Sequence, residues 1–257
     1  MILYPMEKKQ IVIIPVHNQL PYVKKCVKSI QKHSPEAIMI VVDDGSTDEV
    51  TAQWIQDNQD LFVVITNETA LGFTGACNRA IDFAMFNYDF TCLCLLNSDA
   101  EVVTPDWFSK VENHFIIGEN IGIAGVVSNN AMAQTIHNVP KYMDSIDKKP
   151  TIYLEFVHGF CYFISKKLID KIGRLDGHTF PHYGSEDDYS LKALKYGFKN
   201  IVVGSVMVFH NNETSYSHKV RAEYIKKTMP MLMKRWNAYY VDSCVRHANL
   251  ANKYLNE

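Results

Sequence analysis

Apolar segments alternate with segments of helical periodicity along the first half of the chain. Four apolar runs predict buried strands, at residues 10–16, 37–43, 61–66 and 90–97. Each run is followed by a segment whose apolar residues recur at helical spacing, at residues 20–33, 48–58, 74–87 and 105–115. Strand–helix alternation of this kind predicts βαβ units, and therefore a largely parallel sheet covered by helices on both faces.

The alternation becomes less regular after about residue 120. The segments "IGIAGVVS" and "TIYLEFVHGFCYFIS" predict strands, with an irregular loop between them at 129–150. A short helix near 166–172, a helical acidic segment and an apolar strand at 200–210 follow, and the chain ends in helices. We therefore expect a single Rossmann-like α/β domain over residues 1–216, with a mixed, mainly parallel central sheet, and a helical C-terminal extension over 217–257.

The composition is that of an ordinary soluble globular protein. Of the 257 residues, 47% are hydrophobic and 21% are charged, and no apolar run approaches the ~18 residues of a membrane span. The six cysteines form no CxxC pair, and four of them lie inside apolar runs, which favours reduced thiols over a disulfide framework. No signal peptide is recognisable, so these features predict a cytoplasmic protein that is at most peripheral to a membrane.

Charge is distributed unevenly along the chain. The net charge of −2 argues against generic nucleic-acid binding. Residues 217–257 nevertheless carry eight Lys or Arg against three acids, a balance of +5 that leaves about −7 on the preceding residues.

One interpretation of this basic arm is packing on the domain through Met231, Leu232, Met233 and Trp236. The other is contact of its basic face with an anionic membrane or a lipid-linked acceptor. Pro230 is expected to break or kink the arm into two helices.

Polar clusters stand where the predicted strands end. The first strand ends in "PVHN" (15–18), the second in "DDGSTD" (43–48) and the fourth in "NSDAE" (97–101). Adjacent like charges such as Asp43 and Asp44 cost free energy unless something uses them, although a solvated turn with a helix N-cap is an alternative. Because ligands bind outside the carboxyl ends of the strands in open parallel sheets, three such clusters predict one binding site.

These clusters occur in a fixed order with four further motifs: "NETALGFTGACNRAI", "HGFCYFISKKLIDKIGRLD", "SEDDYSLKALKYGFK" and "VFHNNETS". Together they resemble the family 2 glycosyltransferases, inverting enzymes with the A-type glycosyltransferase fold, over about residues 10–215. The resemblance implies a nucleotide-diphospho-sugar transferase domain, with a nucleotide-binding half at about 8–128 and an acceptor half at about 129–216. The motifs lean toward rhamnosyltransferase-like members of the family.

The resemblance implies which residues bind the nucleotide sugar. Those expected near the base, ribose, phosphates or donor sugar are Pro15, His17, Asn18, Asp44, Gly75, Asn78, Arg79, Asn97, Ser98, His158 and Gly159. In this pattern Asp44 hydrogen-bonds the base or ribose, and Asp43 supports the strand end. Glycines before a helix allow the backbone to approach a ligand closely, and the helix N-terminus favours negative charge. Two alternatives need no ligand. Packing alone explains the residues at the start of the helix predicted at 74–87, and His17 is also compatible with a histidine in a surface turn.

A divalent metal, Mn²⁺ or Mg²⁺, is the cofactor that the resemblance implies. Asp99 stands at the last acid of the family's Asp-x-Asp motif, and its first acid is Asn97 here. His210, at the end of an apolar strand, matches the family's second ligand. Carboxylates beside an anionic diphosphate make sense with a cation between them, and mixed O/N ligation suits these metals. The alternatives are a capped turn for Asp99 and a structural role for His210, and Glu101 ranks below Asp99 as a ligand.

Three consecutive acids, Glu186, Asp187 and Asp188, begin a predicted helix. Stabilisation of the helix dipole is worth ~0.3–1 kcal/mol per charge and does not require all three. An inverting transferase needs one carboxylate to deprotonate the acceptor hydroxyl. The resemblance assigns this catalytic role to Glu186 or Asp187, according to the register chosen, and Glu186 is the preferred base.

The sequence therefore predicts an inverting, metal-assisted hexosyltransferase of polysaccharide biosynthesis. It would move a sugar from a UDP-, dTDP- or GDP-sugar to a hydroxyl of a glycan or lipid-linked acceptor. Two other functions compete. A sugar nucleotidyltransferase would carry a Gly-rich loop after the first strand, and "PVHNQLPYVKK" has no Gly. A non-catalytic nucleotide-sugar or carbohydrate-binding module would tolerate loss of Asp99 or of the acids at 186–188, and all of them are present.

Overall fold

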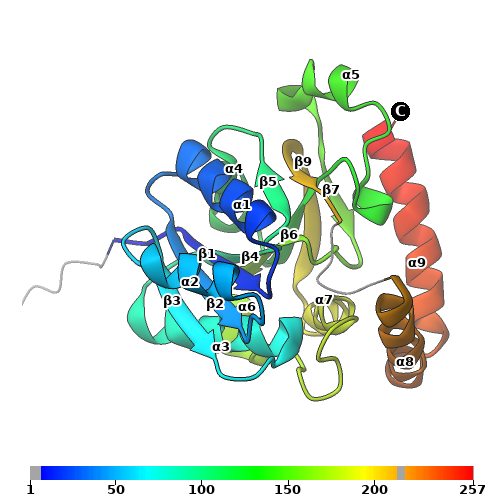
Figure 1. Cartoon of the computed structure of the whole chain (residues 1–257). Helices are drawn as coiled ribbons and strands as arrows, with labels where there is room; N and C mark the ends of the chain where they lie inside the picture. Colours follow the sequence, from blue (N-terminus) through cyan, green and yellow to red (C-terminus); the bar gives the residue numbers. More distant parts are fainter. Residues whose placement is uncertain (1–6, 213–217, 257) are drawn as a thin grey trace, which may run out of the picture.

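The computed structural model of the chain describes residues 7–212 and 218–256, which form an α/β domain followed by two helices (Figure 1). Within these residues nine strands join in one sheet, in the order β3-β2-β1-β4-β8-β6-β9-β5, with β7 paired to β9. The strands are β1 (Ile11–Val16), β2 (Ile38–Asp44), β3 (Val63–Asn67), β4 (Cys92–Leu96), β5 (Ala100–Val102), β6 (Ile121–Val127), β7 (Thr151–Leu154), β8 (Cys161–Ser165) and β9 (Lys199–His210).

Strand directions divide the sheet into two parts. In the first part, β1 runs parallel to both β2 and β4, and β2 runs parallel to β3. In the second part, β8 is antiparallel to β4 and β6, while β9 is parallel to β6 and antiparallel to β5 and β7. The predicted α/β fold with a mixed, mainly parallel sheet is confirmed.

Helices cover both faces of the sheet. One core cluster packs the sheet against α1 (Leu20–His33), α2 (Glu49–Asp57) and α4 (Trp107–Ile117). The other packs it against α3 (Gly72–Asn87), α6 (Lys166–Ile172) and α7 (Ser185–Lys195), and also includes residues of the short α5 (Val139–Met143). Figure 1 shows the two layers with the strands between them. Strands that are buried on both faces have to be apolar throughout, which is why the first four were recognisable as apolar runs.

Helix α1 shows how the apolar spacing of one segment decides which face it buries. Val23, Cys26, Val27 and Ile30 recur at helical spacing, and each is at most 2% exposed. The lysines between these positions point to solvent, and Pro stands at the start of the helix, where its missing N–H costs nothing. The spacing of apolar residues within α1 therefore sets which stripe of the helix is buried against the sheet.

Three features of the second half differ from the sequence predictions. The segment predicted as a strand region at 151–165 is two strands, β7 and β8, separated by a loop at 155–160. The loop predicted at 129–150 contains α5 and two short 3-10 turns. Strand β5 was not predicted, because three residues are too few to show a period and its pairing partner, β9, lies about a hundred residues away.

The C-terminal extension forms two helices, α8 (His218–Trp236) and α9 (Ala238–Ala251), as predicted, but they do not separate at Pro230. Helix α8 continues through Pro230, and the chain turns at Asn237, whose φ is 54°. A proline removes only one helical hydrogen bond, so it need not end a packed helix. The predicted domain boundary at 216/217 lies outside the described residues.

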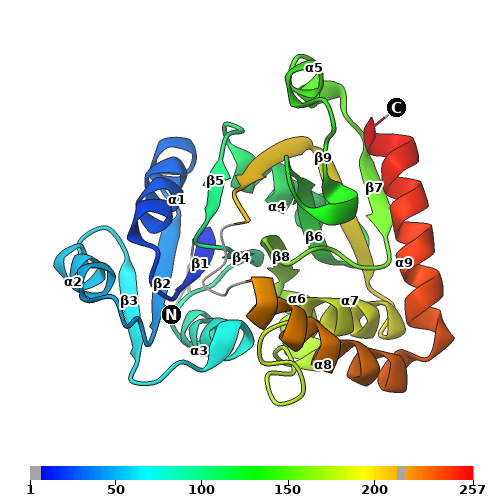
Figure 2. The same ribbon diagram turned by 45° about the vertical axis from the view of Figure 1, so that its right-hand side comes forward.

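Helix α8 lies beside α7, and α9 runs along the β7 edge after the turn that joins the two helices (Figure 2). Leu232 and Tyr240 are buried with Phe180 and Leu191, and Met233 and Trp236 pack beside them. Met231, which was expected to pack in the same way, is 45% exposed because it falls on the opposite side of α8. No helix among residues 7–212 and 218–256 is long and apolar enough to cross a membrane. The six cysteines are free, and five of them are buried.

Candidate active site

The paired acids at the end of β2 are both buried and both accept hydrogen bonds. Oδ1 of Asp44 accepts from Asn67 Nδ2 at 2.7 Å and from the Leu71 backbone N–H at 2.8 Å, and Oδ2 accepts from Gly72 N–H at 2.9 Å. Oδ1 of Asp43 accepts from the Ser46 N–H at 3.0 Å, which fits its expected support of the strand end. Donors satisfy both carboxylates, and Asp44 shapes the loop that leads into α3.

Two residues after β1 tie the ends of β1 and β2 together. The Oδ1 atom of Asn18 accepts from the N–H groups of Thr47 and Asp48, at 2.9 and 2.8 Å. His17 Nδ1 donates to the backbone carbonyl of Asp44 at 2.9 Å, because a carbonyl oxygen only accepts. Pro15 precedes them in β1, where it is half-buried. These contacts assemble the first two predicted polar clusters into one surface at the carboxyl edge of the sheet.

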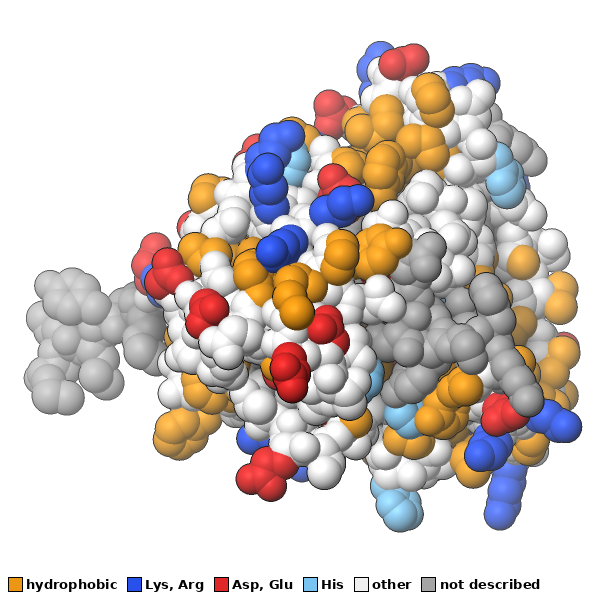
Figure 3. Space-filling view, viewed as in Figure 1, with side chains coloured by type: hydrophobic (Ala, Val, Ile, Leu, Met, Phe, Trp, Pro, Cys, Tyr) orange, Lys and Arg blue, Asp and Glu red, His pale blue; other side chains and the backbone are white. Residues whose placement is uncertain are grey.

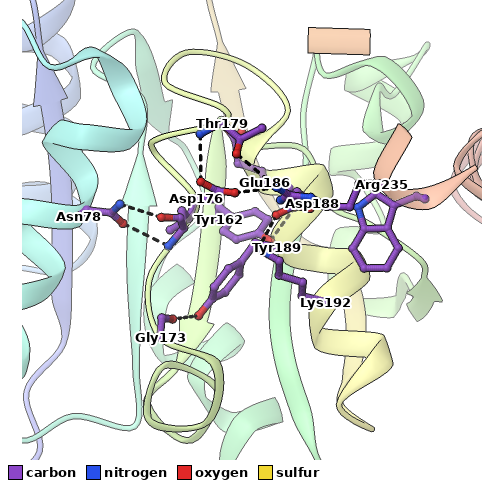
Figure 4. A network of polar contacts seen from close by, with 12 residues as sticks. Asn78, Tyr162, Gly173, Asp176, Thr179, Glu186, Asp188, Tyr189, Lys192 and Arg235 are labelled. Carbon is purple, nitrogen blue, oxygen red and sulfur yellow. Dashed lines mark hydrogen bonds and ion pairs between the residues drawn. The ribbon is translucent and has the colours of Figure 1, made fainter. Parts of the chain in front are cut away.

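The candidate residues of α3 point in two directions. Arg79 donates to the Thr66 carbonyl at 3.0 Å and to Oδ1 of Asn67, so it joins the surface around Asp44. The amide of Asn78 instead pairs with the backbone of Leu175, through Nδ2 at 2.8 Å and Oδ1 at 3.2 Å (Figure 4). A Cβ on Gly75 would lie 2.7 Å from the Leu71 Cβ, so this glycine permits the tight first turn of α3.

The third cluster meets the end of β9. Register pairing sets Ala100 opposite His210, so the turn that precedes β5, formed by Asn97, Ser98 and Asp99, lies beside that histidine. His210 Nε2 lies 3.4 Å from Asp99 Oδ1 and 3.4 Å from Asn97 Nδ2, across 113 residues of sequence in the second case. The structure therefore brings together the two residues that were predicted as metal ligands.

The ring of His210 is held in a defined orientation. Its Nδ1 lies 2.9 Å from the Asn130 carbonyl oxygen, so Nδ1 carries the hydrogen and, in the neutral ring, Nε2 presents its lone pair. Its ring stacks on Phe160 with centroids 5.2 Å apart, and its backbone N–H donates to Asn129 Oδ1 at 2.8 Å. Metal-bound histidines commonly have their second nitrogen fixed by a carbonyl in this way.

Asp99 and His210 fit a divalent cation. Two ligands about 2.1 Å from an octahedral ion and at right angles to it are about 3 Å apart, close to the 3.4 Å between Asp99 Oδ1 and His210 Nε2. In the part of the chain that the structure describes, no group of three or more His, Cys, Asp or Glu residues is placed to hold a metal ion. The protein would thus supply two ligands, and the remaining positions would belong to phosphate oxygens and water.

Glu186 is in the first turn of α7, with its carboxylate against the loop at 155–160. The hydroxyl of Ser185 donates to Oε2 at 2.7 Å, and a Cβ on Gly159 would lie 2.0 Å from Oε1. Burial raises the pKa of Glu186 to about 7, with the charge of Asp187 acting in the same direction and the Ser185 hydrogen bond opposing it. A carboxylate with a pKa near neutrality is suited to general base catalysis.

Asp187 faces the C-terminal extension. The hydroxyl of Tyr240 donates to its Oδ2 at 2.6 Å. Burial raises the pKa of Asp187, and the Tyr240 hydrogen bond and the nearby His158 both lower it. Burial lowers the pKa of His158, and Asp187 opposes that shift. His158 is held by its backbone N–H, which donates to Gln134 Oε1 at 2.8 Å.

Asp188 is completely buried and serves as an anchor. Its Oδ1 lies 2.9 Å from Arg235 Nη1 and accepts from Trp236 Nε1 at 3.0 Å, while its Oδ2 lies 2.8 Å from Lys192 Nζ (Figure 4). Arg235 also binds Asp176, at 2.9 Å. Three consecutive acids are thus held by different partners, and only Glu186 and Asp187 are left as candidates for the base.

The loop at 155–160 joins the two groups of candidate residues. Gly159 lies against Glu186 and the charge of Asp187 acts on His158, whereas the next residue, Phe160, stacks on His210 and accepts from the Asn97 N–H at 2.9 Å. The geometry thus sets the acids on one side of this loop and the predicted metal ligands on the other. Such an arrangement allows one group to take a proton from an acceptor while the other faces the diphosphate of a donor.

Sequence reasoning missed the residues that hold the site from a distance. They are Asn67, Asn129, Gln134, Arg235 and Tyr240. Gln134 was hidden in a segment read as a loop, yet it is completely buried and donates to the Val126 carbonyl at 2.6 Å. Arg235 and Tyr240 lie in the extension, where they were read as part of a basic arm. Only the residue types at these positions, polar groups among apolar ones, could have suggested a role.

Known proteins share the sequence pattern and the architecture of this chain. The model of the family described as "Glycosyl transferase family 2" matches residues 11–173. The uncharacterized protein y4gI of Sinorhizobium fredii (strain NBRC 101917 / NGR234) is 22% identical over 281 residues, which cover 97% of this chain and 30% of that protein. This chain therefore spans less than a third of the length of that curated relative.

Three solved structures have a similar fold. The mannosyltransferase PcManGT from Pyrobaculum calidifontis, in complex with GDP-Man and Mn²⁺, superposes with a TM-score of 0.65 at 16% identity, covering 98% of this chain and 73% of its own. GalNAc-T7 with UDP, GalNAc and Mn²⁺ superposes with a TM-score of 0.65 at 17% sequence identity, covering 92% of this chain and 49% of its own. S. aureus TarS 1-349 superposes with a TM-score of 0.58 at 16% sequence identity, covering 90% of this chain and 74% of its own. At these identities the likeness concerns the fold.

The family match covers more than half of the chain, and it includes three of the four strand ends around which the candidate site is built. The resemblance noted in the sequence motifs is therefore confirmed. The chain belongs to glycosyl transferase family 2 and has the GT-A fold.

Proposed function

We propose that this chain transfers a sugar from a nucleotide-diphosphate donor to a hydroxyl group of an acceptor, with inversion at the anomeric carbon. The observation that carries this proposal is the position of the loop at 155–160 between two groups of residues. Glu186 and Asp187 lie on one side of the loop, and the Asp99–His210 pair lies on the other. Family membership supports the same class of reaction, since the motifs around these residues are those of a nucleotide-sugar transferase.

The donor would lie along the carboxyl edge of the sheet. The surface built by Pro15, His17, Asn18 and Asp44 would receive the base and ribose, with Arg79 and the start of α3 toward the phosphates. Mn²⁺ or Mg²⁺ would be held by Asp99 and His210, with Asn97 and Ser98 beside it. When bound, the cation would neutralise charge that develops on the departing diphosphate. His158 and Gly159 would lie under the donor sugar.

Glu186 is our proposed base, and Asp187 is the alternative. The carboxylate would accept the proton of the acceptor hydroxyl while the oxygen of that hydroxyl bonds to the anomeric carbon from the face opposite the nucleotide. The bond from that carbon to the phosphate oxygen breaks, and the nucleoside diphosphate leaves with the electron pair. The pKa of Glu186, raised by burial to about 7, supports this choice because about half of such a base is ionised at neutral pH and it accepts a proton well.

A hexose donated from a UDP-, dTDP- or GDP-sugar, and a glycan or lipid-linked acceptor, are the substrates we propose. The proteins of similar fold include one in complex with GDP-Man and one with UDP, so the fold serves both nucleotides. The decisive experiment incubates the chain and Mn²⁺ with a panel of donors and measures release of nucleoside diphosphate and transfer of labelled sugar. A Glu186→Gln/Asp187→Asn double variant, which keeps the shape of both side chains, is the control.

Each competing function gives a different result in that experiment. We expect nucleoside diphosphate from one donor, at a rate that the double variant loses. A sugar nucleotidyltransferase would instead form a nucleotide sugar from a nucleoside triphosphate and a sugar phosphate, releasing pyrophosphate. Binding of a donor without turnover, at equal affinity in both proteins, would favour the non-catalytic module. Either of these two results would overturn the proposed transfer.

We further propose that the extension meets an anionic membrane in the cytoplasm through lysines of α8. Figure 3 shows Lys and Arg side chains gathered at the α8 end of this face. Lys226, Lys227 and Lys234 are exposed, whereas Arg235 is engaged by Asp176 and Asp188 and belongs to the fold. Each lysine near such a surface contributes about 1 kcal/mol. Flotation with anionic and neutral vesicles, comparing the wild type with a triple Lys→Gln variant, tests this, and wild-type binding that is equal for both vesicles would contradict it.

A further inference from the structure

The C-terminal extension reaches into the candidate active site through one side chain. Tyr240, in the first turn of α9, is 5% exposed, and its hydroxyl donates to Asp187 Oδ2 at 2.6 Å, across 53 residues of sequence. Of the acids at 186–188, Glu186 takes its short hydrogen bond from Ser185 within α7, and Asp188 is engaged by Lys192, Arg235 and Trp236. Asp187, the neighbour of the proposed base Glu186, is therefore the acid whose hydrogen bond comes from α9.

The position of Tyr240 is fixed by contacts on both sides of it in the sequence. Before it, Arg235 binds the completely buried Asp188 at 2.9 Å. After it, Arg246 binds Glu155, at the beginning of the loop that carries His158 and Gly159, at 2.8 Å. The Tyr240 ring also lies against Phe156 of that loop, with centroids 6.1 Å apart. Tyr240 is thus held by the same two segments, α7 and the 155–160 loop, that form the acid side of the site.

A donor aimed at a carboxylate oxygen affects both its orientation and its charge. A hydrogen bond to the charged form favours that form, and one to a charged group is stronger than one between neutral groups. Several ionisable groups face Asp187, and Tyr240 is the one that donates a short hydrogen bond to it. The others are Glu186 and Asp188 on its own helix, His158 on the loop, Tyr162 on β8 and Cys244 on α9.

We propose that Tyr240 is a positioning residue for the transfer reaction: it fixes the Asp187 carboxylate beside Glu186 and His158, so that α9 is part of the catalytic unit. This inference rests on the function proposed above. It assigns to the extension a role in the site itself, in addition to packing. Without the Tyr240 hydroxyl, Asp187 would lose its short hydrogen bond, protonate at higher pH, and no longer set the local charge around Glu186.

The test compares Tyr240→Phe with Tyr239→Phe. The first substitution keeps the ring that packs on Phe156. Tyr239 is 46% exposed and its hydroxyl donates to Glu155 Oε1 at 3.3 Å, so its loss is the same chemical change without a bond to an acid of α7. We expect Tyr240→Phe to lower kcat at least about tenfold and to leave donor affinity within about twofold. The acidic limb of the pH–rate profile should move to lower pH, because a protonated Asp187 no longer raises the pKa of Glu186. Tyr239→Phe should match the wild type in all three. A Tyr240→Phe enzyme with wild-type kcat and pH profile would overturn the proposal.

A second measurement does not require turnover. Titration of the Asp187 carboxyl by carbon-13 NMR, assigned with Asp187→Asn, reports its protonation in the wild type and in Tyr240→Phe without any substrate. We expect the midpoint to rise in the variant and to stay in place in Tyr239→Phe. An unchanged midpoint in a folded variant contradicts the role of Tyr240, even if the enzyme is active. A raised midpoint in a protein that turns over no donor instead contradicts the proposed function and leaves the contact intact.

Discussion

Gly159 lies directly against the carboxylate of Glu186. A Cβ on Gly159 would stand 2.0 Å from Oε1 and 2.7 Å from Cδ of that side chain, distances that real Cβ atoms essentially never show. The glycine thus allows the loop at 155–160 to approach α7 until the acid and the loop touch. Both residues were predicted as site residues on separate motifs, and this contact shows why one position has to be small when the other is a long acid.

Replacing Gly159 by alanine should therefore damage catalysis more than folding. The new methyl group would push the Glu186 carboxylate aside, and displacement of a reacting group by about 1 Å costs about 10²-fold in rate. We expect kcat to fall by about that factor, with donor affinity by calorimetry nearly unchanged. Gly177→Ala is the control, because a Cβ there meets only ordinary contacts at 3.4 Å or more. Wild-type turnover in Gly159→Ala would show that Glu186 can move without consequence.

The base assignment predicts distinct effects for two neighbouring substitutions. Glu186→Gln should lower kcat by about 10²–10⁴-fold and nearly keep donor affinity, because glutamine has the shape of glutamate and cannot take the proton. In the wild type, activity should rise with pH as Glu186 ionises, with a midpoint near its pKa of about 7. Asp187→Asn should act more weakly. If Asp187→Asn abolishes turnover and Glu186→Gln does not, Asp187 is the base.

Glu186 should also make the fold less stable as pH rises. Its pKa is raised by burial from 4.5 to about 7, so between these values the folded chain keeps a proton that the unfolded chain has released. Stability is therefore highest below pH 4.5 with respect to this group and falls until about pH 7. At ~1.4 kcal/mol per unit, the cost at pH 8 is at most about 3–4 kcal/mol.

Denaturant unfolding of Glu186→Gln and wild type at pH 5 and pH 8 measures this effect. The variant should gain stability relative to the wild type on going from pH 5 to pH 8, by roughly 1–3 kcal/mol. Glu119→Gln carries the same chemical change at an exposed position and is the control. A difference between Glu186→Gln and the wild type that does not change with pH would show that burial does not perturb this carboxyl.

Nucleotide binding should depend on a divalent metal through Asp99 and His210. Calorimetry of UDP, GDP and dTDP with Mn²⁺ and then with EDTA should show at least about tenfold weaker binding of the preferred nucleotide after the metal is removed. Asp99→Asn and His210→Gln should each weaken the Mn²⁺-supported binding similarly, since each removes one of two protein ligands. Asp106→Asn, on the exposed start of α4, is the control. Equal affinities in both buffers would remove the metal from the site.

The two adjacent cations at the end of α8 should differ sharply in their effect on stability. Arg235→Gln breaks an ion pair with the completely buried Asp188 and another with Asp176, and should cost about 1–3 kcal/mol of unfolding free energy. Lys234→Gln changes an exposed side chain and should stay within about 0.5 kcal/mol. Thermal or denaturant unfolding of both variants gives the comparison. Equal stabilities would mean that the Arg235 pairs contribute nothing to the fold.

Much of the fold was determined by properties of single segments. Apolar runs and helical spacing predicted β1 to β4, β6, β9 and the helices between them other than α5, because those patterns report burial of one element whatever its neighbours are. The ends of those strands also located the polar clusters, since the carboxyl edge of a parallel sheet follows from strand direction alone. The polar edge of the sheet was foreseeable in this way, and the family resemblance pointed to the pairing of Asp99 with His210.

The remaining features were decided only by how distant segments pack. The contacts of Gly159 with Glu186, of Asp187 with Tyr240 and of Asp188 with Arg235 join parts of the chain that share no local period. Strand β5 needed β9, and the turn at Asn237 needed a surface for both C-terminal helices. A side chain's burial, charge and orientation depend on every element that touches it. The amino-acid sequence alone therefore named the acids, whereas their division into base candidates and a structural anchor came from the tertiary structure.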